Sequence, residues 1–364
     1  MPFTAPPLFP GDLFEGAARL AASAEGRLSA VSEAPARAAV LDALWEEAAA
    51  LGWPAVMVPE AQEGAGGTLE DLVAILDGAG RAALPLPLAA ACGVVPAMLP
   101  AEAGGVVLPF VASGEWRVAP AFAELMRDPR SPAAAAATEG GVLRLSGSVI
   151  GMEAPPGATH TLLHAPVDGA SGLILLPLDE GGPGLRRFER LDGRPSLDVL
   201  LDGVTLPGTA LLARGEAVAR AAASARALGT LLVMVEAVAA MGALVGQTIE
   251  YLSTRVQFGE TLSRFQVLRH GTVDLYTRHE AARALVVSLV TAAAETSVAE
   301  LDARTLHLAK LHVGRAAREV AEGAIQLHGG MGLTDELPAS RLTKRLLCVE
   351  FDYGDGAVHA ALAA

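Results

Sequence analysis

Tyr251-Leu-Ser-Thr-Arg-Val-Gln-Phe-Gly259 ends a long apolar segment, and Ser263-Arg-Phe-Gln266 follows it closely. A second stretch, Ala324-Ile-Gln-Leu-His-Gly-Gly-Met-Gly-Leu-Thr-Asp-Glu336, ends a later helical segment. Taken singly, paired glycines after a helix are an ordinary C-cap, and single phenylalanines are ordinary core residues. Considered one at a time, these residues therefore favour ordinary structural roles over a ligand site.

Long helices are predicted around both stretches. Apolar residues recur at helical spacing over residues 218–254, 265–295 and 298–327. The most apolar part, residues 231–252, contains Glu236 and Glu250 and is mostly Ala, Val and Gly, which favours a buried core helix over a membrane span. We therefore expect residues 214–364 to be helical.

The rest of the chain predicts an α, β, α order. Residues 1–106 have helical composition, interrupted by a Gly/Pro loop after which Thr68 is placed to cap a new helix. Residues 107–213 change to short apolar runs separated by Gly, Pro, Asp and Ser, which predicts a small antiparallel β domain. The predicted strands are residues 142–145, 161–164, 172–177 and 198–201, and the Ala-rich residues 132–137 are expected to form a surface loop.

Composition disfavours several classes of protein. The 364 residues carry a formal net charge of −14, which disfavours nucleic-acid binding, so a phosphate-bearing ligand would need a local basic pocket. Cys92 and Cys348 are far apart, so neither a disulfide framework nor a metal site is expected. The first residues match no signal or transit peptide, and the expected location is cytoplasmic.

Together, the two stretches resemble the C-terminal helical domain of acyl-CoA dehydrogenases. The matching residues are Arg255-x-Gln-Phe-Gly259, Phe265-Gln266 and Gln326-Leu-His-Gly-Gly330, and a Gly-Trp…Val-Pro-Glu…Gly-Gly loop at residues 52–67 is also typical of the family. The resemblance implies an α+β multidomain fold. Its parts are an N-terminal all-α domain at 1–106, a middle antiparallel β-barrel at 107–213 and a C-terminal four-helix bundle at 214–364.

The resemblance also implies that the chain binds FAD, partly across a subunit interface. Arg255 suits the FAD pyrophosphate because a guanidinium is permanently charged and forked, and Gln257 can add neutral donors. Phe258 and Phe265 would supply apolar walls, while paired glycines leave backbone amides open to a ligand. The implied FAD contacts are Arg255, Gln257, Phe258, Phe265, Gln266, Gln326, Leu327, Gly329, Gly330 and Asp355.

The implied reaction is α,β-dehydrogenation of an acyl-CoA to a 2-enoyl-CoA, with an electron-transferring flavoprotein as acceptor. It needs a carboxylate base whose pKa is raised in an apolar pocket. The two positions that usually hold this glutamate fall at Tyr353 and Gly229. Neither residue can serve as a carboxylate base, so the catalytic base is unknown.

Three carboxylates are candidates for a substitute base. Asp355 is the first candidate because it is nearest in sequence to the usual position. Glu236 shares a helix face with Gly229 but lies about 10 Å further along the axis. A buried structural carboxylate paired with an arginine is the favoured interpretation of Glu236. Glu350 is expected to be a solvated or paired side chain.

Two departures from the family pattern point to a narrower group. Val118-Ala-Pro-Ala-Phe-Ala123 replaces a Thr-Glu-Pro run that usually meets the flavin ring. Tyr353-Gly-Asp355 with His359 resembles the small subunits of heteromeric acyl-CoA dehydrogenases such as the pimeloyl-CoA type, although His359 is also readable as a surface residue. Two hypotheses remain: a homo-oligomeric dehydrogenase with an unusual base, or a non-catalytic subunit that completes the FAD site of a glutamate-bearing paralogue.

Overall fold

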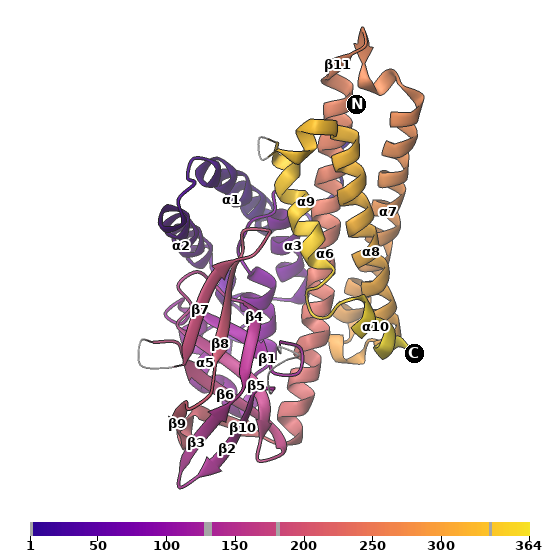
Figure 1. Ribbon diagram of the computed structural model, residues 1–364. Helices are drawn as coiled ribbons and strands as arrows, with labels where there is room; N and C mark the ends of the chain where they lie inside the picture. The colour runs from indigo at the N-terminus through magenta and orange to yellow at the C-terminus, as the bar shows by residue number, and fades with distance from the viewer. Residues whose placement is uncertain (1–2, 127–132, 180–182, 335–336) are drawn as a thin grey trace. The chain divides into compact units, whose positions relative to one another are not determined.

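The computed structural model describes residues 3–126, 133–179, 183–334 and 337–364 (Figure 1). The chain forms two compact units. The helical unit contains Met1–Ser32, Leu69–Leu84 and Thr230–Ala364, and the mixed unit contains Glu33–Thr68 and Pro85–Gly229. The predicted domain boundaries at residues 106 and 213 stay predictions.

The helical unit is built from long helices at the positions that the apolar period predicts. The predicted helices 218–254 and 265–295 are confirmed to within two residues, as α6 (Glu216–Thr254), which belongs to this unit from Thr230 onward, and α7 (Gln266–Glu295). The third begins later than predicted, because Asp302 caps it: its carboxylate accepts the Thr305 amide at 2.8 Å. The remaining helices of this unit are α1 (Asp12–Ser29), α3 (Leu69–Gly80), α8 (Ala303–His328), α9 (Pro338–Val349) and α10 (Gly356–Ala363).

Helix α6 is a buried core helix, as predicted. Within the described part of the chain it alone is long and apolar enough to cross a membrane, but 94% of its most apolar window is buried inside the protein. Its charged residue Glu236 is also buried. An apolar helix surrounded by protein is the expected centre of a helical core.

The mixed unit begins with helices around the Gly/Pro loop. Helix α2 (Ala34–Ala50) ends before this loop, and α5 (Ala101–Ala112) precedes the first strand. The loop folds back on itself, because the Gly66 amide donates to the Val58 carbonyl and the Gly67 amide to the Val56 carbonyl. Gly64 is required there, since a Cβ at that position would lie 2.0 Å from the Val58 carbonyl oxygen.

Two sheets share one hydrophobic core in the mixed unit. The larger has the order β10-β6-β5-β2-β3-β9, with β1 added beside β5, and the smaller has the order β4-β8-β7. Leu143, Leu163, Ile174 and Leu197 belong to the common core. The strands are β1 (Val118–Phe122), β2 (Ala135–Glu139), β3 (Val142–Ser146), β4 (Ser148–Glu153), β5 (His160–Val167), β6 (Ala170–Pro177), β7 (Gly184–Glu189), β8 (Pro195–Leu200), β9 (Thr205–Pro207) and β10 (Leu211–Arg214).

Two predictions for this region were wrong, while all four predicted strands are present. The sheet is not purely antiparallel, because β1 pairs with β5 in parallel, with Val118 opposite His160. The Ala-rich stretch is not a loop throughout: from Ala135 it forms β2, which pairs antiparallel with β3. Pro132 lies outside the described residues. Alanine has low intrinsic strand preference, and the ladder with β3 overrides it.

Candidate functional site

A short hairpin at the end of α6 carries three of the candidate residues. Strands β11 (Val256–Gln257) and β12 (Glu260–Thr261) are joined by Phe258 and Gly259, whose φ angles are 56° and 82°. Two left-handed residues in sequence make a tight two-residue turn, and glycine takes the second place without steric cost. The Phe258 side chain is 88% exposed and its ring meets that of Phe265 edge-on at 6.0 Å. The hairpin projects from one end of the helical unit (Figure 1). Arg255, Gln257 and Phe258 are all exposed.

The end of α8 carries a second group of candidates. His328 is the last residue of this helix, and Gly329 follows it with a φ of 61°. Gln326, Gly329 and Gly330 are exposed, whereas His328 is buried. Asp335 and Glu336, the last two residues of the quoted motif, lie outside the described residues.

One direct contact joins these two groups. The Tyr251 hydroxyl on α6 donates to the His328 carbonyl at 3.2 Å, and the two rings lie 4.6 Å apart. Gln326 and Leu327 also line a groove of about 450 Å³ between α7 and α8, together with Gly271, Asp274, Leu275, Arg278, Glu319, Glu322 and Gly323. The structure thus joins the α8 terminus to the last turn of α6, from which the hairpin leaves.

The C-terminal loop holds the position where the family usually has its base. Tyr353 occupies it with a φ of 58°, a left-handed conformation that costs a non-glycine residue about 1 kcal/mol or more. Asp355 caps α10, because its Oδ1 accepts the Val358 amide at 2.9 Å. The first candidate base is therefore engaged at a helix N-terminus.

Glu236 belongs to a buried ion network. Arg345 on α9 donates to Glu236 at 2.6 Å and to Asp352 at 2.8 Å. The Glu236 and Arg345 side chains are each 3% exposed, and that of Asp352 is 8% exposed. Of the two interpretations of Glu236, the structure supports the carboxylate paired with an arginine.

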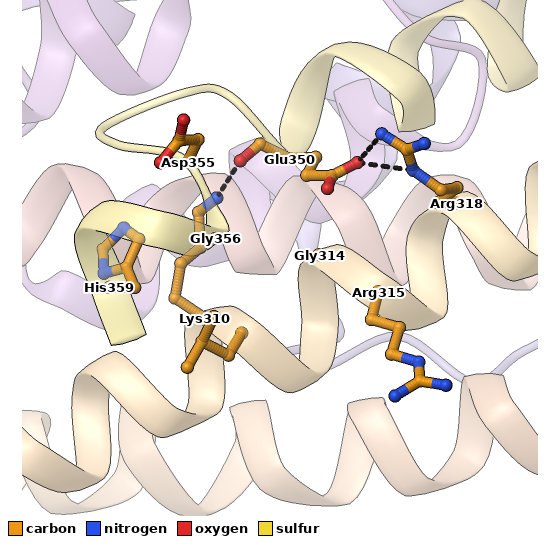
Figure 2. A pocket seen from close by; sticks show the side chains of 9 residues that line it. Lys310, Gly314, Arg315, Arg318, Glu350, Asp355, Gly356 and His359 are labelled. Atoms are coloured by element: carbon orange, nitrogen blue, oxygen red, sulfur yellow. Dashed lines mark hydrogen bonds and ion pairs between the residues drawn. The ribbon is translucent and has the colours of Figure 1, made fainter. Parts of the chain in front are cut away.

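Glu350 lies on a pocket beside α8 and is also paired (Figure 2). Its Oε2 accepts the Arg318 Nε at 2.6 Å, as the sequence analysis expects. The pocket has a volume of about 330 Å³ and is lined by Lys310, Leu311, Gly314, Arg315, Arg318, Glu350, Asp355, Gly356 and His359.

Lys310 crosses from α8 to the end of α9. Its Nζ donates to the Val349 carbonyl at 2.8 Å and to the Glu350 carbonyl at 3.2 Å. Burial lowers the pKa of this lysine to about 8, against an opposing effect of Asp352. The lysine supplies donors to terminal carbonyls of α9 that have no partner within the helix.

His359 is a core residue, so its interpretation as a surface residue was wrong. It is 1% exposed, and its Nδ1 lies 2.9 Å from the Nδ1 of His307. One Nδ1 must carry the hydrogen and the other must accept it. Burial is the main cause that lowers the pKa of His359 to about 4, and Lys310 and His307 act in the same direction.

Sequence reasoning missed Tyr251, Lys310 and Arg345 as partners of the candidate residues. Tyr251 lies in the motif at the end of α6, but a tyrosine there predicts no particular partner. Val349, which accepts from Lys310, lies 39 residues away in the chain, and Glu236, which accepts from Arg345, lies 109 residues away. Helical periodicity identifies which face of a helix is buried, but it does not identify which distant residue meets that face.

Known proteins resemble this chain in sequence and in fold. The family model described as acyl-CoA dehydrogenase, C-terminal domain, matches residues 213–364. Acyl-CoA dehydrogenase IpdE2 of Mycolicibacterium smegmatis is 34% identical over 106 residues, 29% of this chain and 32% of that protein. IpdE2 of Mycobacterium tuberculosis is 36% identical over the same length, which is 31% of that protein. The alignment thus spans about a third of each of these relatives.

Solved structures match over nearly the whole chain. The Tcur3481-Tcur3483 steroid ACAD superposes with a TM-score of 0.81 at 25% identity, covering 96% of this chain and 95% of that one. The ChsE4-ChsE5 complex from Mycobacterium tuberculosis gives a TM-score of 0.79 at 20% identity, covering 95% of both chains. These likenesses define an α+β fold with a helical C-terminal part and a sheet region in the middle.

The fold is that of acyl-CoA dehydrogenases. Residues 213–364 match the acyl-CoA dehydrogenase C-terminal domain, and the chain as a whole is similar to acyl-CoA dehydrogenases in fold.

Proposed function

We propose that this chain is the base-lacking subunit of a heteromeric, FAD-dependent acyl-CoA dehydrogenase. In this role it completes the FAD site of a glutamate-bearing paralogue. The observation that carries the proposal is that each candidate base is engaged in a structural contact. Glu236 pairs with Arg345, Glu350 with Arg318, and Asp355 caps α10.

The chemistry explains why these contacts matter. A catalytic base must be within reach of the substrate and must accept a proton near working pH. A carboxylate in a buried ion pair is held in its charged form by its partner, and removing it from the pair is costly. Tyr353 offers a phenol in place of this carboxylate.

The residues at the exposed end of the helical unit are suited to binding FAD rather than to acting as a catalytic base. Arg255 would bind the pyrophosphate, Phe258 would face the adenine, and the Gly329 and Gly330 amides would be available as donors. Phe258 is 88% exposed and Arg255, Gly329 and Gly330 are exposed as well, so the chain's own side chains leave these groups open. Bound FAD supplies the acceptor for the substrate hydride, and the residues of this chain hold and orient it.

The remaining parts of the proposal follow the family. We propose a middle β-barrel and a C-terminal four-helix bundle, assembly with a glutamate-bearing paralogue, an acyl-CoA substrate for the assembly, an electron-transferring flavoprotein as acceptor and a cytoplasmic location. The names of two solved relatives support a two-protein assembly, since Tcur3481-Tcur3483 and ChsE4-ChsE5 each join two different chains.

One observation favours the alternative, a dehydrogenase that works alone. Asp355 lines the pocket of about 330 Å³ and stands two residues after Tyr353. In this alternative it would have to leave the α10 N-terminus to act as the base, which would weaken the helix start.

The test is flavin content and reduction, measured on the chain alone and on its complex with a glutamate-bearing paralogue. We expect the complex to hold FAD and to bleach when an acyl-CoA from a panel of chain lengths is added without oxygen. The chain alone should show no bleaching. Bleaching by the chain alone would overturn the partner role and support the alternative.

Two exposed arginines that flank the β11–β12 hairpin, Arg255 and Arg264, give a matched control for FAD binding. Arg255→Met should lower the FAD content of the complex, because it removes the proposed pyrophosphate contact. Arg264→Met should leave the FAD content unchanged, since the exposed Arg264 pairs with Glu260 on the same hairpin. Equal FAD contents in the two variants would contradict the proposed cofactor contact.

A further inference from the structure

We propose that Tyr251 is a positioning residue that sets the glycine turn at Gly329 and Gly330 relative to the hairpin that carries Arg255 and Phe258. The inference deepens the proposed function and rests on it. Tyr251 itself is not expected to touch the cofactor.

Tyr251 is bound at both ends to the two groups of candidate residues. Its backbone carbonyl accepts the Arg255 amide at 2.9 Å, one helical turn further along α6. Its hydroxyl donates to the His328 carbonyl at 3.2 Å. His328 directly precedes Gly329, so Tyr251 links the residues from which the hairpin and the glycine turn begin.

The Tyr251 hydroxyl donates a hydrogen bond to the His328 carbonyl, which has no donor within α8. The last four carbonyls of an α-helix have no donor within the helix, and His328 ends α8. The Tyr251 hydroxyl supplies a donor for this terminal carbonyl. Without it, the end of α8 would lose a hydrogen bond that orients the following turn.

The His328 ring has a fixed orientation and packs against the Tyr251 ring. Its Nδ1 lies 2.8 Å from the Ala324 carbonyl, so Nδ1 carries the hydrogen and donates to its own helix. The ring is therefore held in one orientation, and its face lies against Tyr251 with 4.6 Å between ring centroids and 31° between planes. His328 is 4% exposed, and burial lowers its pKa, which keeps the imidazole neutral.

A second contact holds the α8 terminus from the side of α7. Leu327 packs against Gly271, where a Cβ would lie 3.2 Å from Leu327 Cδ2. The residue before His328 is thus fixed on α7 while His328 is fixed on α6. With both anchors present, the exposed Gly329 and Gly330 start from a defined point, and Tyr251 is the anchor shared with the hairpin.

The experiment uses the complex of this chain with the glutamate-bearing paralogue, freed of FAD. It measures the affinity of this complex for FAD, ADP and FMN. Tyr251→Phe keeps the ring and removes one hydrogen bond, so we expect FAD and ADP to bind about three- to tenfold more weakly. FMN, which lacks the adenylate, should bind as before. Tyr251→Leu removes the ring as well and should weaken FAD and ADP further.

Tyr276→Phe is the matched control, because Tyr276 lies on α7 and packs its ring edge-on against Phe3 at 5.3 Å. It should leave all three affinities unchanged. The positioning role would be overturned if the wild-type complex retains FAD and both Tyr251 variants bind FAD and ADP as tightly as wild type. That result would leave the proposed function intact. A wild-type complex that binds no FAD would overturn both. Equal weakening of FMN and ADP would show a general loss of structure and would also overturn the positioning role.

Discussion

Arg345 Nη2 lies 2.6 Å from Glu236 Oε2, and both side chains are 3% exposed. Removing one partner of a buried ion pair leaves an uncompensated charge, which typically costs about 3–5 kcal/mol. We therefore expect Arg345→Met to lower the free energy of unfolding by about 3–5 kcal/mol, because Glu236 and Asp352 both lose this partner. Urea denaturation followed by circular dichroism measures the change.

Arg341→Met is the control for this prediction. Arg341 is on the same helix and pairs with Glu25 at 2.9 Å, but the two side chains are 28% and 36% exposed. A pair this exposed contributes at most about 1 kcal/mol. Similar losses for the two variants would contradict a special role of the buried network.

Substitutions of Asp355 can distinguish a role as a helix cap from a role as the catalytic base. Asparagine is as good an N-cap as aspartate, whereas alanine at that position costs about 1 kcal/mol. We expect Asp355→Asn to keep both the stability and the acyl-CoA-dependent turnover of the complex, and Asp355→Ala to lose stability. Steady-state turnover and thermal unfolding measure the two effects. Loss of turnover in Asp355→Asn at unchanged stability would identify Asp355 as the base.

The lowered pKa of His359 predicts a contribution to stability that is lost at acidic pH. Its pKa in the folded protein is lowered to about 4 from 6.5, so the unfolded chain takes up the proton first as the pH falls. The contribution is present above pH 6.5 and is lost on acidification toward pH 4, amounting to at most about 3 kcal/mol. We expect His359→Gln to reduce the slope of unfolding free energy against pH in this window. His270→Gln, on the exposed start of α7, should retain the wild-type slope; identical slopes for the two variants would refute the prediction.

The order of helices and strands could be predicted because it depends on local periodicity. Residues 142–145 and 172–177 were identified as strands from apolar runs and flanking turn residues, and they lie in β3 and β6. The parallel pairing of β1 with β5 could not be predicted, since pairing joins residues about 40 positions apart and leaves no local signal.

In the candidate site too, residues in short motifs could be predicted, whereas contacts between distant parts of the chain could not. Arg255, Phe258 and Gly329 follow from short motifs, and the structure places them at exposed helix ends. The task of Asp355 was readable in principle, because aspartate directly before a helical segment is an N-cap signal. The partners of Glu236 and Lys310 depend on how α6, α8 and α9 pack, which one helix's pattern does not encode.

Lys310 gives the last prediction, in which two effects oppose one another. Lys310→Met deprives the Val349 and Glu350 carbonyls of a donor, which costs about 1–3 kcal/mol for a buried group. The same change removes a buried ammonium whose pKa is lowered to about 8 from 10.5. Since the unfolded chain holds that proton between pH 8 and 10.5, the wild type gains stability across this window, by at most about 3 kcal/mol. We therefore expect the variant and the wild type to have similar stabilities at pH 7, because the two effects nearly cancel, and the variant to become the less stable of the two toward pH 10.5. Urea denaturation at several pH values measures the gap, Lys344→Met should retain the wild-type rise, and a gap that is constant with pH would contradict the lowered pKa of Lys310.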